Sequence, residues 1–233
     1  MSILLPHSDD ELFALPFINK KINEGLKIHI FFITTDFNAA REKESEKMLS
    51  HFPEVEVHHF GKLNNIEDSS LKNCRDVVQN LLANDFIIKS SESIVTTMYE
   101  GGHIDHDEVF KIGVFLSDTL NKPHFSFSLY NAYRTPLVRV STFFPGPVKG
   151  ETELIYFSLA EGWSYLKKVF YYKSQFVALS VLFSGLFKTF ILKRKIEIIK
   201  ISSFDPDLDH PGKAFYKNKW KDRIKTLLRV PTR

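Results

Sequence analysis

Two hydrophobic patterns alternate through the first half of the chain. Short apolar, β-branched runs are typical of buried strands, and apolar residues recurring every three or four positions are typical of helices. Strands are expected at residues 2–5, 26–35, 55–60 and 93–99, and helices at residues 9–25, 39–51, 68–83 and 105–121. We expect Asp68 or Ser69 to cap the third of these helices. This alternation predicts an α/β fold, in which helices flank a mostly parallel, Rossmann-like sheet.

The pattern changes after about residue 123. Strands are expected at residues 125–130, 137–143, 154–157 and 196–202, one long or two consecutive helices at residues 161–192, and a short helix at residues 220–228. A length of 233 residues suits one domain of this kind. We therefore expect a Rossmann-like core in residues 1–122. Residues 123–233 are expected to be a strand and helix extension that completes the sheet and covers a substrate pocket.

The composition excludes some kinds of site. The only cysteine is Cys74, so a disulfide within the chain and a cysteine-based zinc site are both excluded. Residues 1–5 are too short for the basic and apolar regions of a signal peptide. The apolar run at residues 176–192 is interrupted by Gly185 and Lys188 and falls short of a membrane span. We therefore expect a soluble cytoplasmic protein.

Charge is distributed unevenly. Residues 1–161 hold 15 Lys/Arg and 23 Asp/Glu, whereas residues 162–233 hold 16 Lys/Arg and 5 Asp/Glu. A basic C-terminal third suggests a phosphorylated substrate, a lipid head group or a nucleic acid as partner, or else a solvated face. No nucleic-acid partner is expected, because no recognisable module interleaves basic and aromatic residues. The apolar run before Lys193-Arg194-Lys195 suggests peripheral membrane contact, the alternative being a core helix with a basic end.

Two polar segments directly follow expected strands, residues 6–11 and residues 101–106. Parallel sheets bind ligands beyond the carboxyl ends of their strands, so both segments are expected in a ligand-binding edge. We predict that His7, Asp10 and His106 bind one zinc ion per chain. Two imidazoles and one carboxylate leave a position open for water, as in catalytic zinc sites. Ferrous iron or cobalt accepts the same ligands.

The neighbouring polar residues suit hydrolysis. Asp9 is the candidate base that takes a proton from water, and His103 is the candidate group that stabilises an oxyanion or protonates a leaving amine. Asp105 is expected to orient a histidine ligand. The alternative is that Asp9 and Asp10 only cap the helix that follows them.

These segments resemble the two signature motifs of the LmbE-like, or PIG-L, N-acetylglucosaminyl deacetylase family, His-Pro-Asp-Asp-Glu and Gly-His-Pro-Asp-His. The resemblance implies that His7, Asp10 and His106 are zinc ligands, Asp9 the general base and His103 the group on the oxyanion side. It implies a zinc-dependent hydrolase that removes the acetyl group from an N-acetylated amino sugar. The implied substrate is an N-acetylglucosaminyl conjugate, and phosphorylated and lipid-linked forms both stay open.

The resemblance extends to further segments. Thr34-Thr35-Asp36 corresponds to the family's Thr-Asp-Gly turn, and Arg41 and Glu44 correspond to an Arg-x-x-Glu pattern. Asp36 and Arg41 are therefore implied to contact the substrate. Lys173-Ser174-Gln175 resembles a helix motif that ends in Ser-Gln. The chain departs from the family at three positions that supply no ligand, where Ser8 and Ile104 replace prolines and Phe37 replaces a glycine.

Three alternatives to this function stay open. The same site could cut another amide conjugate, the chain could be a sugar- or lipid-binding protein with a degenerate site, or the basic tail could bind nucleic acid. The residues Asp205, Asp207, Asp209 and His210 could form a second metal site, but two prolines make a plain loop the favoured interpretation.

Overall fold

The computed structural model describes residues 1–36, 39–131, 139–143 and 147–205. Its strands are β1 (Ser2–Leu5), β2 (Ile28–Phe32), β3 (Val55–His58), β4 (Ile94–Thr97), β5 (His124–Phe127), β6 (Tyr130–Asn131), β7 (Arg139–Val140), β8 (Val148–Tyr156) and β9 (Lys195–Phe204). Its α-helices are α1 (Glu11–Asn23), α2 (Ala39–Leu49), α3 (Phe60–Leu63), α4 (Leu71–Asn84), α5 (Phe86–Ser90), α6 (Ile104–Leu120), α7 (Leu159–Lys168) and α8 (Phe176–Phe187). Two 3₁₀ turns, η1 (Val169–Tyr171) and η2 (Lys173–Gln175), precede α8, and a π-helical turn, η3 (Lys188–Lys193), follows it.

Seven strands form one sheet in the order β3-β2-β1-β4-β5-β9-β8. The strands β1 to β5 are parallel, and the β8–β9 hairpin extends the sheet in antiparallel fashion beyond β5. The predicted α/β fold with a mostly parallel sheet is thus confirmed. The order of the strands reverses between β1 and β4, and ligands of such sheets bind at the carboxyl ends of strands at this switch point.

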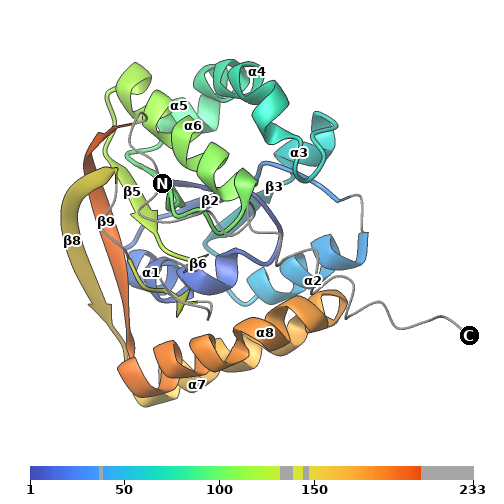
Figure 1. Ribbon diagram of the computed structural model, residues 1–233, viewed down its shortest axis with the longest axis vertical. Helices are drawn as coiled ribbons and strands as arrows, with labels where there is room; N and C mark the ends of the chain where they lie inside the picture. Colours follow the sequence, from blue (N-terminus) through green and yellow to red (C-terminus); the bar gives the residue numbers. More distant parts are fainter. Residues whose placement is uncertain (37–38, 132–138, 144–146, 206–233) are drawn as a thin grey trace, which may run out of the picture.

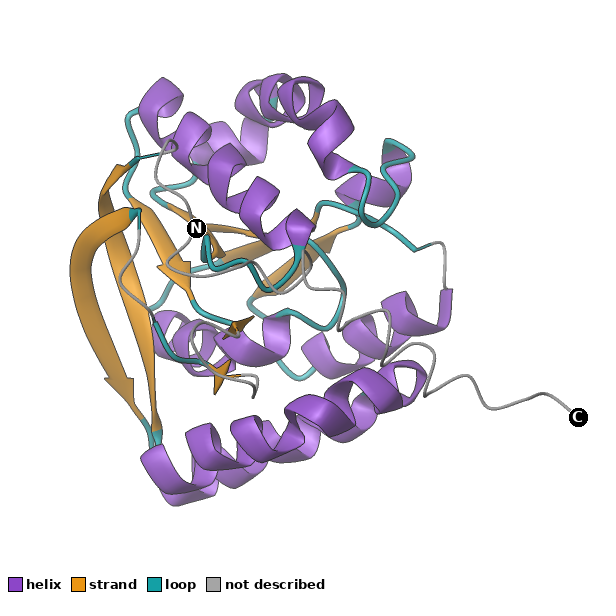
Figure 2. Ribbon diagram, viewed as in Figure 1, coloured by secondary structure: helices purple, strands orange, loops and turns teal. Residues whose placement is uncertain are grey.

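Helices cover both faces of the sheet (Figure 1). Helices α3 to α6 lie on one face, whereas α1 and α2 lie on the other with α7 and α8 beyond them (Figure 2). Successive side chains of a strand point to opposite faces, so Ile3 and Leu5 of β1 enter the core under α1 and α7, and Leu4 enters the core under α4 and α6. Burial on both faces fixes the register of β1 and hence the position of the loop that follows it.

Several local predictions need correction. Helices α3 and α5 are absent from the sequence prediction, and β8 begins at Val148 rather than at residue 154. Helix α4 begins at Leu71, and its N-cap residue Ser70 makes no capping hydrogen bond through its side chain. Asp68 does not cap this helix, because its carboxylate instead accepts hydrogen bonds from Thr34 Oγ1 and Arg41 Nη1.

The segment expected to hold one long or two consecutive helices contains α7, two 3₁₀ turns and α8. Its last part, Lys173–Lys193, is a continuous helical stretch of 21 residues with a mean hydropathy of 1.7. By length and composition it could cross a membrane, contrary to the sequence prediction, because the helix continues through Gly185 and Lys188. The predicted helix at residues 220–228 and the residues Asp207, Asp209 and His210 lie outside the described residues.

Candidate metal centre

The turn between β1 and α1 carries the first group of polar side chains. Asp10 is the N-cap residue of α1, but its carboxylate turns back, and Oδ2 accepts a hydrogen bond from the backbone N–H of His7 at 3.0 Å. Asp9 has a φ of 129°, a conformation that side chains with a Cβ rarely adopt, and its N–H donates to Glu11 Oε2 at 2.7 Å. Backbone strain of this kind gathers at functional sites. The turn therefore fixes the Asp10 carboxylate against the backbone of His7 and the backbone of Asp9 against Glu11.

The loop between β4 and α6 carries the second group. Gly101 has a φ of 67°, and a Cβ on Gly102 would lie 2.2 Å from the carbonyl oxygen of Tyr130. Both positions thus require glycine. Asp107 Oδ1 accepts the backbone N–H groups of Glu100 and Gly101 at 3.1 and 3.0 Å, and this closes the loop over the first turn of α6.

Three histidines from the two loops converge. Ligating atoms of His7, His103 and His106 all lie within 4.8 Å of one another. The Asp10 carboxylate lies between two of these rings, with Oδ2 at 3.2 Å from His7 Nδ1 and Oδ1 at 3.5 Å from His106 Nε2. The structure thus brings His7, Asp10, His103 and His106 together from two motifs that lie far apart in the sequence.

The group has the properties of a site that is completed by a cation. His106 is 1% exposed, and within the described residues neither of its ring nitrogens has a hydrogen-bond partner; the same holds for Asp105 Oδ1. Leaving a buried polar atom unpaired costs about 1–3 kcal/mol, so such atoms ordinarily have a partner. Imidazole nitrogens and carboxylate oxygens together suit zinc and related divalent metals.

The charges around His7 also favour a cation. Burial disfavours the charged ring, but the hydrogen bonds to Asp10 and Asp105 prevail and raise the pKa of His7 to about 10. Asp105 Oδ2 lies 3.2 Å from His7 Nε2 and also accepts the N–H of Ser69 at 2.6 Å. A proton and a metal ion therefore compete for the same acidic surroundings.

Arg41 connects Asp9 to two other carboxylates. Its Nη2 donates to Asp9 Oδ1 at 2.6 Å and its Nε to the Ser8 carbonyl at 2.6 Å, and its Nη1 lies 3.2 Å from Asp68 Oδ2 and 3.5 Å from Asp36 Oδ2. Burial raises the pKa of Asp9 to about 6, although the Arg41 charge lowers it. Arg41 and Asp36, predicted to contact a substrate, are thus paired with each other beside Asp9.

His103 caps α6 through its ring. Its Nδ1 accepts the backbone N–H of Asp105 at 3.2 Å, which places the proton of the neutral ring on Nε2 by inference from this hydrogen bond. His103 is less buried than His106, with 18% of its side chain exposed. It can therefore present an N–H donor to a molecule that enters from solvent.

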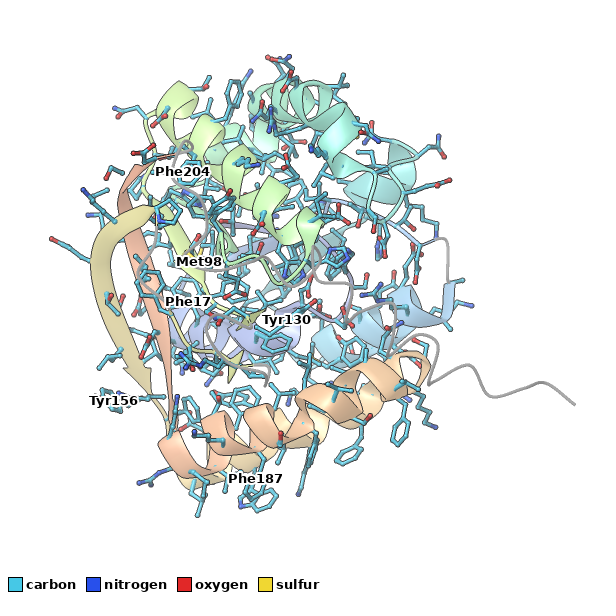
Figure 3. All side chains as sticks on the ribbon, in the orientation of Figure 1. Phe17, Met98, Tyr130, Tyr156, Phe187 and Phe204 are labelled. Carbon is cyan, nitrogen blue, oxygen red and sulfur yellow. The ribbon has the colours of Figure 1, made fainter. Side chains whose placement is uncertain are left out.

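Some residues of the centre carried no signal in the sequence. Asp68 and Tyr130 (labelled in Figure 3) come from segments without a motif. Asp68 nevertheless contacts Arg41, and the Tyr130 ring lies 5.3 Å from that of His106. Glu11 belongs to the first motif, and its buried carboxylate accepts hydrogen bonds from Ser45 and Tyr172. Only the fold brings these segments to the motif.

A small polar cavity lies beside the centre, next to His7. This cavity of about 10 Å³, enough for one water, is lined by His7, Ser8, Thr34, Thr35, Asp36, Arg41, Glu42 and Asp68. A second group of metal-ligand types, His29, Glu56 and His58, lies at the β2–β3 edge. That group is more exposed, and Glu56 is already paired with Lys27 at 2.7 Å.

Comparison with solved structures places the fold among known deacetylases. The zinc-inhibited form of teicoplanin deacetylase Orf2 superposes with a TM-score of 0.67 at 14% identity, over 88% of this chain and 98% of that one. The pseudoaglycone deacetylase Dbv21 gives 0.64 at 13% identity over the same shares of the two chains. A conserved protein from Thermus thermophilus gives 0.57 at 15% identity, over 85% and 93%. No protein-family model matches the sequence, and no curated protein matches it closely. At such identities the likeness shows a shared fold.

Proposed function

We propose that this protein is a metal-dependent hydrolase that removes the acetyl group from an N-acetylated amino sugar conjugate. The observation that carries the proposal is the convergence of His7, Asp10, His103 and His106, in which the buried ring nitrogens of His106 have no hydrogen-bond partner among the described residues. The shared fold with proteins described as deacetylases and the two motifs support it.

His7, Asp10 and His106 would hold the ion, for which zinc is our first choice and ferrous iron the second. When bound there, the metal supplies Lewis-acid chemistry, which polarises the acetamido carbonyl and makes water a usable nucleophile at neutral pH. Asp105 is the group that orients His7, since its Oδ2 lies 3.2 Å from the ring Nε2.

Asp9 is the proposed base. Its carboxylate takes a proton from the attacking water and can pass it to the leaving nitrogen, so that an acetate and a free amine result. Arg41 positions this carboxylate through the 2.6 Å bond to Oδ1, and Glu11 fixes the backbone N–H of the same residue. Both partners hold Asp9 in its strained backbone conformation.

His103 is the proposed donor to the reacting amide. With Nδ1 engaged by the N–H of Asp105, the ring presents Nε2–H to the oxyanion that develops on the carbonyl, or to the amine. Asp36 lines the small polar cavity beside His7, together with Arg41, and is proposed to contact a sugar hydroxyl.

The test combines metal content with acetate release. Purified protein reconstituted with zinc should hold about one ion per chain, and Asp10→Ala and His106→Ala should both lose it. His58→Ala is the matched control, because it removes a histidine from the β2–β3 group and should keep the ion. Loss of metal in the control but not in the other two variants would place the ion at the wrong site and contradict the proposal.

Asp9→Asn separates chemistry from binding. It should retain the metal and slow acetate release from acetylated amino sugars by about 100-fold or more, as expected for loss of a general base. A metal-loaded protein that releases no acetate from any such sugar, and that Asp9→Asn leaves unchanged, would refute the proposed activity.

A further inference from the structure

Helix α8 is apolar all round yet remains largely uncovered. A helix of this composition ordinarily lies in a protein core or in a membrane. Across the 18-residue window that is most apolar in Lys173–Lys193, only 22% of the residues are buried. Within α8, Leu179 and Leu186 face the domain, whereas Phe176, Val177 and Val181 are between 56% and 69% exposed.

The exposed apolar surface extends over neighbouring elements. Trp163 of α7 packs edge-on against Phe187, with ring centroids 6.1 Å apart, and Phe170 of η1 packs against Phe183 at 6.3 Å. Figure 3 shows the side chains of α8, Phe187 among them, projecting from its outer side. We call this surface the α7–α8 face and define it by the exposed apolar residues Trp163, Phe170, Phe176, Val177, Val181 and Leu192.

A cavity of about 600 Å³ opens between η1 and α8, beside this face. Its walls are almost wholly apolar and include Val169, Phe170, Phe176, Leu179 and Phe183. Water in such an apolar cavity finds few hydrogen-bond partners, whereas an apolar chain that enters it removes hydrocarbon surface from water.

The positive charge of the same segment favours an anionic partner. Residues 162–196 contain seven Lys/Arg and no Asp/Glu. Lys167, Lys173, Lys188, Lys193 and Arg194 are exposed. Basic side chains beside exposed aromatic and aliphatic ones are the composition of helices that lie in the interface of an anionic membrane. A second copy of this face is a poorer partner, because a symmetric contact would bring both sets of cations together.

The packing of α8 indicates that it lies flat rather than spanning the bilayer. Leu186 and Phe190 are fully buried, and a Cβ on Gly185 would lie 2.4 Å from Val140 of β7, so the helix is pressed against the domain at this point. The other helical face then remains for contact with lipid. Its basic residues at both ends can reach the head groups of one leaflet.

We propose that the α7–α8 face docks this protein on the surface of an anionic lipid bilayer. The face adjoins the metal centre: Tyr172, at the rim of the cavity, donates to Glu11, which in turn accepts the N–H of Asp9. Docking stands independently of the proposed chemistry, since it rests on the exposed residues and charge of this segment alone.

The test is flotation of the full-length protein with lipid vesicles. Vesicles in which about one third of the phosphatidylcholine is replaced by phosphatidylglycerol should bind the protein, and binding should weaken at high salt and with phosphatidylcholine alone. The double variant Phe176→Ser, Val181→Ser should reduce binding by about 10-fold or more, because both side chains lose apolar contact with lipid. Both positions are exposed, so the fold should be retained.

Phe86→Ser is the matched control. Phe86 lies on α5, on the other face of the sheet, and is 81% exposed, so its replacement should leave vesicle binding unchanged. Two results would overturn the proposal. One is binding that the double variant does not reduce, and the other is a dimer in vesicle-free solution that the double variant dissociates, which would assign the face to a second copy.

A fluorescence measurement locates the contact. The chain has two tryptophans, Trp163 and Trp220, so Trp220→Phe leaves Trp163 as the single tryptophan reporter. Brominated lipids should quench Trp163 when the α7–α8 face inserts into the interface. Vesicle-bound protein whose Trp163 is not quenched would show that another surface makes the contact.

Discussion

Replacement of Asp105 by asparagine tests the support of the metal centre without removing a proposed ligand. Asp105 is fully buried, and its Oδ2 accepts from Ser69 N at 2.6 Å and lies 3.2 Å from His7 Nε2. A hydrogen bond to an ionised group contributes about 1.5–3 kcal/mol and a neutral one about 0.5–1.5 kcal/mol. Asparagine keeps the shape of the side chain and an acceptor for Ser69 but loses the negative charge. The hydrogen bond that holds His7 should therefore weaken by about 1–1.5 kcal/mol.

Since each 1.4 kcal/mol is tenfold in affinity, the zinc Kd should rise by about 10-fold. That agrees with the roughly 10- to 100-fold usual for such supporting groups. The assay is zinc titration in competition with a chromophoric chelator. Asp76→Asn is the matched control, because that side chain is 83% exposed and pairs with Arg75 rather than with a histidine. If Asp105→Asn binds zinc within about twofold of the wild type while Asp10→Ala fails to bind, the orienting role of Asp105 is refuted.

Three further predictions concern the same framework. Arg41→Lys should lower kcat for acetate release by about 10-fold or more with metal content unchanged, because the single ammonium group of lysine cannot bond Asp9, the Ser8 carbonyl and Asp68 in the fixed directions of a guanidinium; an unaltered kcat would contradict this. Gly113→Ala would place a Cβ 2.5 Å from Thr96 Cγ2, so overpacking should cost about 1–3 kcal/mol and lower the Tm seen by calorimetry; an unchanged Tm would show that α6 can shift. Burial lowers the pKa of His124 from 6.5 to about 3, so below pH 6.5 the unfolded chain binds more protons and stability falls by up to about 1.4 kcal/mol per pH unit. Urea unfolding should show a smaller acid loss in His124→Gln.

The sequence alone determined the core of the fold and the main residues of the centre. Residues 1–121 alternate buried strands with amphipathic helices, and this local periodicity is sufficient to predict a parallel sheet. The two motifs follow β1 and β4, and the edge of a parallel sheet then places His7 and His106 near each other. Spacing and residue type therefore predicted which side chains converge, because both are properties of short segments.

The tertiary structure decided which partners those side chains have. Asp68 was expected to cap α4, yet it binds Thr34 and Arg41, since the chain after β3 returns to the same edge of the sheet. Nothing in the sequence places Tyr130 against His106 or Tyr172 against Glu11, because long stretches of chain separate these pairs and only packing joins them. Likewise, hydropathy describes α8 as apolar, but only the assembled domain determines how much of that helix is covered. Residue type and spacing are properties of short segments of the sequence, whereas burial and pairing depend on contacts between segments far apart in the chain.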